Sequence, residues 1–126
     1  MQEIWKPITG FENLYEISNL GNVRSLERII IDKLGRKLVF HSVMLVPRKT
    51  NRGYYAINLS KNGKFKNYSI HRLVAEAFID NSDNLPCVDH INGDKTLNTV
   101  DNLRWCTYEE NSNNPITLQR MHKPRK

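Results

Sequence analysis

Residues 88–111, VDHINGDKTLNTVDNLRWCTYEEN, restrict the fold of this chain more than any other stretch. Two short segments, CVDHI at residues 87–91 and LRWC at residues 103–106, predict a pair of strands. The residues between them are mostly Asn, Asp, Thr and Gly, which favour turns and loops over regular structure. The stretch therefore predicts a strand, a long loop and a second strand, an order that can bring its polar residues together.

A helix is predicted to follow the second strand. Thr107 precedes Glu110 by three residues, the capping-box spacing in which the hydroxyl and the carboxylate each satisfy a free backbone N–H at a helix start. The helix should therefore begin at Tyr108. Its end stays open, because Pro115 disfavours helical geometry at Asn114 and could end or bend the helix there.

The residue types on these elements suit phosphodiester hydrolysis. That reaction needs a base to take a proton from water and a cation to neutralise the charge on the departing oxygen. His90 has a side chain whose ordinary pKa of about 6.5 suits a base, and Asp89 can bind Mg²⁺, which prefers oxygen ligands. Asn111 on the following helix offers a second oxygen ligand. Asn102, just before the second strand, can hold the loop that orients His90.

Simpler interpretations compete for several of these positions. An Asp-His pair before Asn-Gly is often an ordinary turn, but the asparagines, the capping box and the basic residues upstream together favour a site. Cys87 and Cys106 with His90 could suggest zinc, yet they lack the paired spacing of structural zinc sites, so two small buried side chains are preferred. Asn98 is interpreted as a residue that could brace the loop. His71 is interpreted as packing locally at the start of a helix.

Basic residues are concentrated in one part of the chain. The formal net charge is +6 at pH 7, and no acidic residue lies between Asp32 and Glu76. A field of one sign attracts polyanions, so nucleic acid is the predicted partner. The residues expected to contact DNA are Arg48, Lys49, Arg52, Lys61, Lys64, Lys66, Arg72 and Arg104. The first three are expected to lie in a loop and to reach into a groove.

The rest of the chain is predicted to be rich in strands. Asn62-Gly63 between two alternating runs is a strong hairpin signal. Apolar residues recur at helical spacing through residues 69–78, so a helix should lie across the preceding strands. Other predicted strands cover residues 15–17, 23–26 and 37–46, with Pro47 ending the last of them. These elements predict the α+β fold class.

Residues 88–111 resemble the nuclease motif of the HNH endonucleases, in particular the phage and intron-encoded homing enzymes whose third motif position is asparagine. The sequence HRLVAEAFI at residues 71–79 resembles the segment that commonly precedes this motif. Residues 3–28, which contain ITGFENLYEISNLGNVRSL, resemble the nuclease-associated modular domain at the N-terminus of such enzymes. The chain is short for a homing enzyme, and no helix-turn-helix pattern follows the motif.

The resemblance implies a ββα-metal (His-Me finger) nuclease motif. It implies His90 as the general base, Asp89 and Asn111 as ligands of one Mg²⁺ or Mn²⁺ ion, and Asn102 as the structural asparagine. It also implies three parts: a strand-rich nuclease-associated module at 1–46, a basic DNA-binding hairpin and helix at 47–80, and the nuclease motif with a basic tail at 81–126. The expected partner is double-stranded DNA.

The expected activity is hydrolysis of a DNA phosphodiester to 5′ phosphate and 3′ hydroxyl ends. Nicking and double-strand cleavage both remain open, as do a monomer and a homodimer. The alternative is a catalytically silent DNA-binding protein or regulator on the same scaffold. No apolar run is long enough to span a bilayer and the first residues lack the pattern of a secretory signal, so a cytoplasmic location is expected, in the host cell if a phage encodes the chain.

Overall fold

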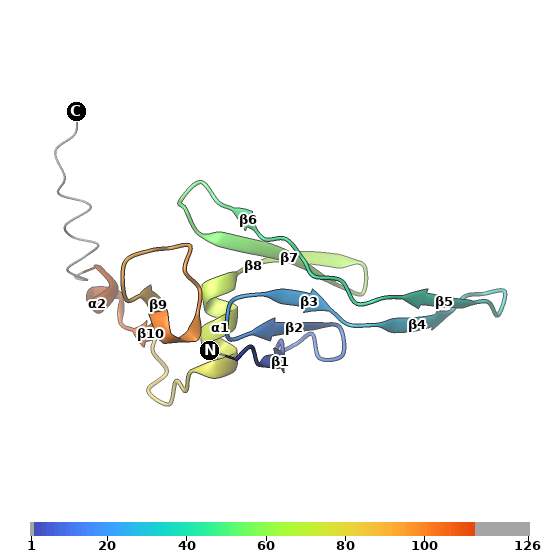
Figure 1. Ribbon diagram of the computed structural model, residues 1–126, viewed down its shortest axis with the longest axis horizontal. Helices are drawn as coiled ribbons and strands as arrows, with labels where there is room; N and C mark the ends of the chain where they lie inside the picture. Colours follow the sequence, from blue (N-terminus) through green and yellow to red (C-terminus); the bar gives the residue numbers. More distant parts are fainter. Residues whose placement is uncertain (1, 113–126) are drawn as a thin grey trace.

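The computed structural model describes residues 2–112, and Figure 1 shows the arrangement of its elements. The chain is rich in strands and has two α-helices and one short 3-10 helix, η1 (Val100–Asn102), in this part, as the α+β prediction required. The strands are β1 (Trp5–Pro7), β2 (Tyr15–Ser18), β3 (Val23–Ser25), β4 (Arg28–Ile31), β5 (Lys37–Phe40), β6 (Arg48–Lys49), β7 (Tyr55–Lys61), β8 (Lys64–Ser69), β9 (Cys87–His90) and β10 (Leu103–Cys106), and the helices are α1 (Ile70–Phe78) and α2 (Tyr108–Ser112).

An N-terminal sheet of order β1-β2-β3 begins the fold. The turn between β2 and β3 closes with a backbone hydrogen bond of 2.8 Å from Ser18 N to Asn22 O. Gly21 has a φ of +85° there, a conformation that favours glycine. Ile17 and Val23 on the paired strands are fully buried, so one face of this sheet joins the core.

Strands β4 and β5 form a separate two-stranded ribbon. Figure 1 shows this ribbon projecting from the end of the molecule opposite β9 and β10. The prediction of one strand over residues 37–46 was wrong, because β5 ends at Phe40. Beyond it the chain returns to the N-terminal sheet, where Ser25 N donates to Val43 O at 2.9 Å and Leu45 N donates to Val23 O at 2.9 Å.

The central sheet has the order β6-β7-β8. Asn62 and Gly63 connect β7 to β8 with φ of 54° and 75°, the pair of positive values that a two-residue type I′ turn requires. The predicted hairpin is therefore confirmed. Arg48 and Lys49 were expected in a loop, but they form β6 and pair with Ala56 and Tyr55. The loop begins after them, at residue 50.

Helix α1 organises the core. Its apolar face buries Ile70, Leu73, Val74 and Ala75, which confirms the predicted helix at residues 69–78 to within one residue. These side chains pack in one cluster with residues of the N-terminal sheet, the central sheet and the β9–β10 hairpin. Because this cluster is shared, α1 links all three parts of the chain. Full burial of a side chain such as Ile70 contributes about 1.5–3 kcal/mol to stability.

The β9–β10 hairpin and α2 complete the described chain. Antiparallel pairing places Cys87 opposite Cys106 and His90 opposite Leu103, as the predicted strand pair required. Thr107 N donates to Glu110 Oε1 and Glu110 N donates to Thr107 Oγ1, both at 3.1 Å. The capping box and the helix start at Tyr108 are thereby confirmed. Pro115 and the basic tail lie outside the described residues, among which no helix has the length and apolar character to cross a bilayer.

Candidate active site

Asp89 and His90 end strand β9, and both are buried, with 4% and 5% of their surface exposed. Neighbouring residues on a strand face opposite sides, so the two side chains reach different surroundings. Asp89 lies directly across from Arg104 on β10, and Arg104 Nε donates to Asp89 Oδ2 at 3.0 Å. A buried carboxylate is costly without such a partner, so this ion pair holds Asp89 in place.

The ring of His90 is held by Asn98. His90 Nε2 lies 2.8 Å from Asn98 Oδ1, and both residues are buried. A carboxamide oxygen only accepts hydrogen bonds, so Nε2 carries the proton and Nδ1 of the neutral ring keeps its lone pair. Burial lowers the pKa of His90 below its ordinary value, with the Asn98 hydrogen bond acting in the opposite direction. The ring is therefore neutral at pH 7 and presents Nδ1 as a base.

Asn102 closes the loop between β9 and β10. Its Oδ1 accepts from Asn92 N at 3.1 Å, and its Nδ2 donates to Asn92 Oδ1 and to Leu97 O, both at 3.0 Å. Its carbonyl oxygen accepts from Ile91 N at 2.8 Å. Asn102 thus fastens both ends of the loop that carries Asn98. The sequence predicted that Asn102 holds the loop that orients His90, and the residue of that loop that contacts the ring is Asn98, which the sequence suggested as a brace for the loop.

His71 is the second residue that sequence reasoning undervalued. Its ring centroid lies 4.9 Å from that of His90 and 5.0 Å from that of Tyr54. Burial, the largest cause, lowers the pKa of His71 to about 4. Its Nδ1 is buried without a hydrogen-bond partner in the described part of the chain. The available signal was its position next to buried Ile70, at the edge of the apolar face of α1.

The oxygen donors of this region fit a hard divalent cation. Asp89 supplies a carboxylate that already faces a cationic group, and Asn111 lies half-buried in α2, which packs against β9. Within residues 2–112 no three His, Cys, Asp or Glu side chains are grouped to hold a metal. A metal at Asp89 would therefore depend on carboxylate, amide and water oxygens, the ligand set of Mg²⁺. The oxygen atoms of Asp89 and Asn111 belong to this ligand set.

The two cysteines face each other across the hairpin as free thiols. Cys106 is fully buried. Burial, followed by the nearby carboxylate of Asp89, raises the pKa of the Cys106 thiol to about 11. A thiol of this kind is a poor metal ligand and a poor nucleophile, because the thiolate is the reactive form. Both observations favour the packing interpretation of Cys87 and Cys106.

The basic residues expected to contact DNA are distributed over several elements. Arg48, Lys49 and Arg52 lie on β6 and in the turn after it, while Lys61, Lys64 and Lys66 lie at the other end of the central sheet (Figure 1). Two arginines already have structural partners. Arg72 Nη1 donates to Pro86 O at 3.0 Å, and Arg104 pairs with Asp89. The structure thus distributes these cations over the central sheet, α1 and β10.

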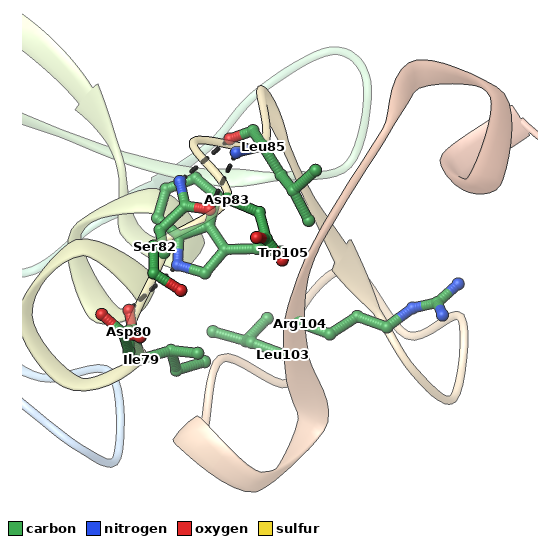
Figure 2. Close-up of a pocket in the computed structure, with 9 residues that line it drawn as sticks. Ile79, Asp80, Ser82, Asp83, Leu85, Leu103, Arg104 and Trp105 are labelled. Carbon is green, nitrogen blue, oxygen red and sulfur yellow. Dashed lines mark hydrogen bonds between the residues drawn. The ribbon is translucent and has the colours of Figure 1, made fainter.

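A shallow pocket lies on the face of the β9–β10 hairpin opposite the side chain of Asp89. Figure 2 shows Trp105 facing residues 79–85, with its Nε1 donating to Ile79 O at 3.0 Å. Arg104 extends away from this pocket in the same view. The alternation along β10 therefore separates a packing face, with Leu103 and Trp105, from the face that holds Asp89.

Comparison with known proteins finds two family matches along the chain. Residues 3–60 match the NUMOD4 motif, and residues 68–113 match the HNH endonuclease family. The region that holds Asp89, His90, Asn98 and Asn102 therefore belongs to the HNH endonuclease family, and a NUMOD4 motif precedes it.

The particular relatives are viral. DNA endonuclease I-HmuI of Bacillus phage SP01 is 37% identical over 113 residues, which are 90% of this chain and 58% of that protein. Uncharacterized HNH endonuclease L245 of Acanthamoeba polyphaga mimivirus is 40% identical over 113 residues, which are 90% of this chain and 30% of that protein. The solved structure titled "DNA binding and cleavage by the HNH homing endonuclease I-HmuI" matches with a TM-score of 0.72 and 35% identity, covering 97% of this chain and 62% of that one. The chain thus spans less than two thirds of each relative.

Proposed function

We propose that this chain is a metal-dependent DNA endonuclease, homing-endonuclease-like, in which His90 is the general base. The observation that carries the proposal is the environment of His90. Its neutral imidazole lies beside Asp89, and its Nε2 is held by Asn98 Oδ1 at 2.8 Å. Homology to I-HmuI, whose solved structure concerns DNA binding and cleavage, supports DNA as the substrate.

The chain's own residues have separate roles in this proposal. Nδ1 of His90 takes a proton from the attacking water, because Nε2 already carries a proton toward Asn98. Burial keeps the ring neutral and therefore able to accept that proton at pH 7. Asn102 holds the loop closed around the ring. Misplacement of a base by about 1 Å can reduce the rate about 100-fold, so loop closure matters for the chemistry.

Asp89 and Asn111 are the proposed metal ligands. The order β9, β10 and α2 supports a ββα-metal arrangement, with one ligand on the first strand and one on the helix. A divalent ion such as Mg²⁺ or Mn²⁺ supplies charge neutralisation at the leaving 3′ oxygen when it is bound. Arg104 Nε donates a hydrogen bond to Asp89 Oδ2 and thereby fixes the orientation of the carboxylate.

Plasmid cleavage tests the proposal. Supercoiled plasmid is incubated with the chain and Mg²⁺, Mn²⁺ or EDTA, and nicked and linear products are separated by gel. We expect nicking with a metal and none with EDTA. His90→Ala should slow it by about 10²- to 10⁴-fold, while His41→Ala, at a histidine whose side chain is 80% exposed, should not. Wild-type protein that binds plasmid but never cuts it with either metal would contradict the enzyme and favour the silent DNA-binding alternative.

The basic central hairpin is proposed to contribute affinity for double-stranded DNA. Lys64 and Lys66 are exposed, and Lys61 lies at the same hairpin end. Reversing all three to Glu should weaken binding and reduce the dependence of affinity on salt, because fewer counterions would be released from DNA phosphates. The matched control changes the same lysines to Arg and keeps the charge. Equal binding by both triple variants would rule out this role.

A further inference from the structure

The turn that joins β2 to β3 contacts the loop of the candidate active site. Val100 N, in that loop, donates to Asn19 O at 2.9 Å. Gly21, two residues further along the turn, approaches Asn98 so closely that a Cβ built on it would lie 3.0 Å from both the Cβ and the carbonyl oxygen of Asn98. The residue that holds His90 is therefore itself packed against the NUMOD4 region.

The turn is internally fixed and can act as a support. Ser18 is fully buried, and its Oγ accepts from Leu20 N at 3.2 Å and from Asn22 N at 3.1 Å. Asn19 is also buried, with Oδ1 accepting from Ile4 N at 2.8 Å and Nδ2 donating to Gln2 O at 3.0 Å. Buried, satisfied polar groups of this kind specify a single local conformation.

We propose that Asn98 is a positioning residue for His90, and that the Ser18–Asn22 turn holds Asn98 in place. The NUMOD4 region then contributes to the chemical step as well as to any DNA contact. The path is short: the turn packs on Asn98, Asn98 Oδ1 accepts from His90 Nε2, and that hydrogen bond leaves Nδ1 with its lone pair. The inference rests on the proposed function for its kinetic consequence, but the tautomer of His90 can be measured without any cleavage.

The first experiment compares Gly21→Ala with Gly10→Ala. Both glycines have nearly the same φ, +85° and +87°, so both variants impose the same backbone strain. Only Gly21 faces Asn98, because nothing lies within 4 Å of a Cβ on Gly10. We expect Gly21→Ala to lower the single-turnover nicking rate about 10- to 100-fold at saturating DNA, with little change in DNA affinity. Gly10→Ala should cut at nearly the wild-type rate.

Imidazole ¹⁵N NMR of the metal-free protein gives the independent readout. At mildly alkaline pH, wild-type His90 should show a protonated Nε2 and an unprotonated Nδ1, and Gly10→Ala should match it. Gly21→Ala should shift these signals toward a mixture of tautomers. Unchanged His90 signals in Gly21→Ala, or equal nicking rates in the two alanine variants, would overturn the inference about the turn.

Substitution of Asn98 itself tests whether Asn98 positions His90, independently of the Gly21 variant. Asn98→Ala removes the acceptor and should give mixed His90 tautomers with a loss of rate at unchanged DNA affinity. Asn98→Asp keeps an acceptor oxygen at the same place and should restore the Nε2-protonated form. A wild-type tautomer in Asn98→Ala would overturn the positioning role. Correct tautomer behaviour in a protein that never cleaves DNA would instead contradict only the proposed function.

Discussion

Two antiparallel strand pairs of the same size differ in almost every other respect. The β9–β10 hairpin and the β4–β5 ribbon each pair four residues with four. Every residue of β4 and β5 is exposed, so no second layer within residues 2–112 covers the ribbon. Each strand of the hairpin has buried residues and packs against α1.

The difference shows which strand pair holds its side chains in a fixed geometry. The loop of the β9–β10 hairpin is tied by the side chains of Asn98 and Asn102 and by the turn at Ser18–Asn22. An isolated two-stranded pair is marginally stable in water. The ribbon is held by its own ladder, the Asp32 turn and the contact of Arg28 with the Phe40 ring. A reaction that needs side chains placed to within fractions of an ångström is therefore expected on the hairpin. Changes in the conformation of the ribbon should not affect that reaction.

The largest effect should come from His90→Ala. Loss of a general base reduces a rate by about 10²- to 10⁴-fold, and single-turnover nicking of supercoiled plasmid measures it. His41→Ala, just beyond the ribbon, is the matched control, and we expect it to cut as wild type does. A His90→Ala protein that folds and still nicks at the wild-type rate would remove the catalytic distinction between the two regions.

Asn102→Ala should give the largest loss of stability. The variant leaves Asn92 N and Leu97 O without the partners they have in the loop, which costs about 2–4 kcal/mol in the free energy of unfolding. Urea denaturation measures the change. Asp32→Ala is the control in the ribbon, because the Asp32 side chain also bonds two backbone groups, accepting from Leu34 N and Arg36 N, but does so at an exposed turn. An equal loss in both variants would show that burial does not separate the regions.

The sequence predicted the features that depend on residues close together in the chain. The strands β9 and β10, the capping box at Thr107 and the Asn62-Gly63 turn depend on neighbours in sequence, and the structure confirms them. Asn98 and Asn102 are four residues apart in one polar loop, and only the path of the loop decides which of them reaches His90.

Long-range contacts explain what sequence reasoning missed. His71 lies 19 residues before His90 in the chain, and packing of α1 against β9 brings the two rings to 4.9 Å. The run Ile29-Ile30-Ile31 has the composition of a buried strand, yet it is exposed because no other element in the described part of the chain covers it. The roles of Asp89 and Asn111 as metal ligands stay predictions, which the cleavage and metal experiments address.

Acid should destabilise the protein through His71. Its folded pKa of about 4 lies below the ordinary 6.5, so the unfolded chain binds the proton first as the pH falls. Stability is therefore complete above pH 6.5 and decreases toward pH 4, by as much as about 3 kcal/mol. His71→Phe keeps a ring beside Tyr54 and should make this dependence less steep in urea titrations at several pH values, leaving the part due to His90, whose pKa burial also lowers. A His71→Phe curve as steep as wild type would assign the acid sensitivity elsewhere.

The smallest effect should come from the ribbon. Ile31 is 63% exposed on β4, so Ile31→Thr, which keeps a β-branched side chain, should change the free energy of unfolding by less than about 0.5 kcal/mol. Val88→Thr makes the corresponding exchange on β9, where the side chain is 8% exposed, and should cost about 1–3 kcal/mol because a hydroxyl enters the core. Urea denaturation of the two variants measures the contrast directly. A loss at Ile31 as large as that at Val88 would mean that another surface covers the ribbon in solution, and that the two strand pairs are alike after all.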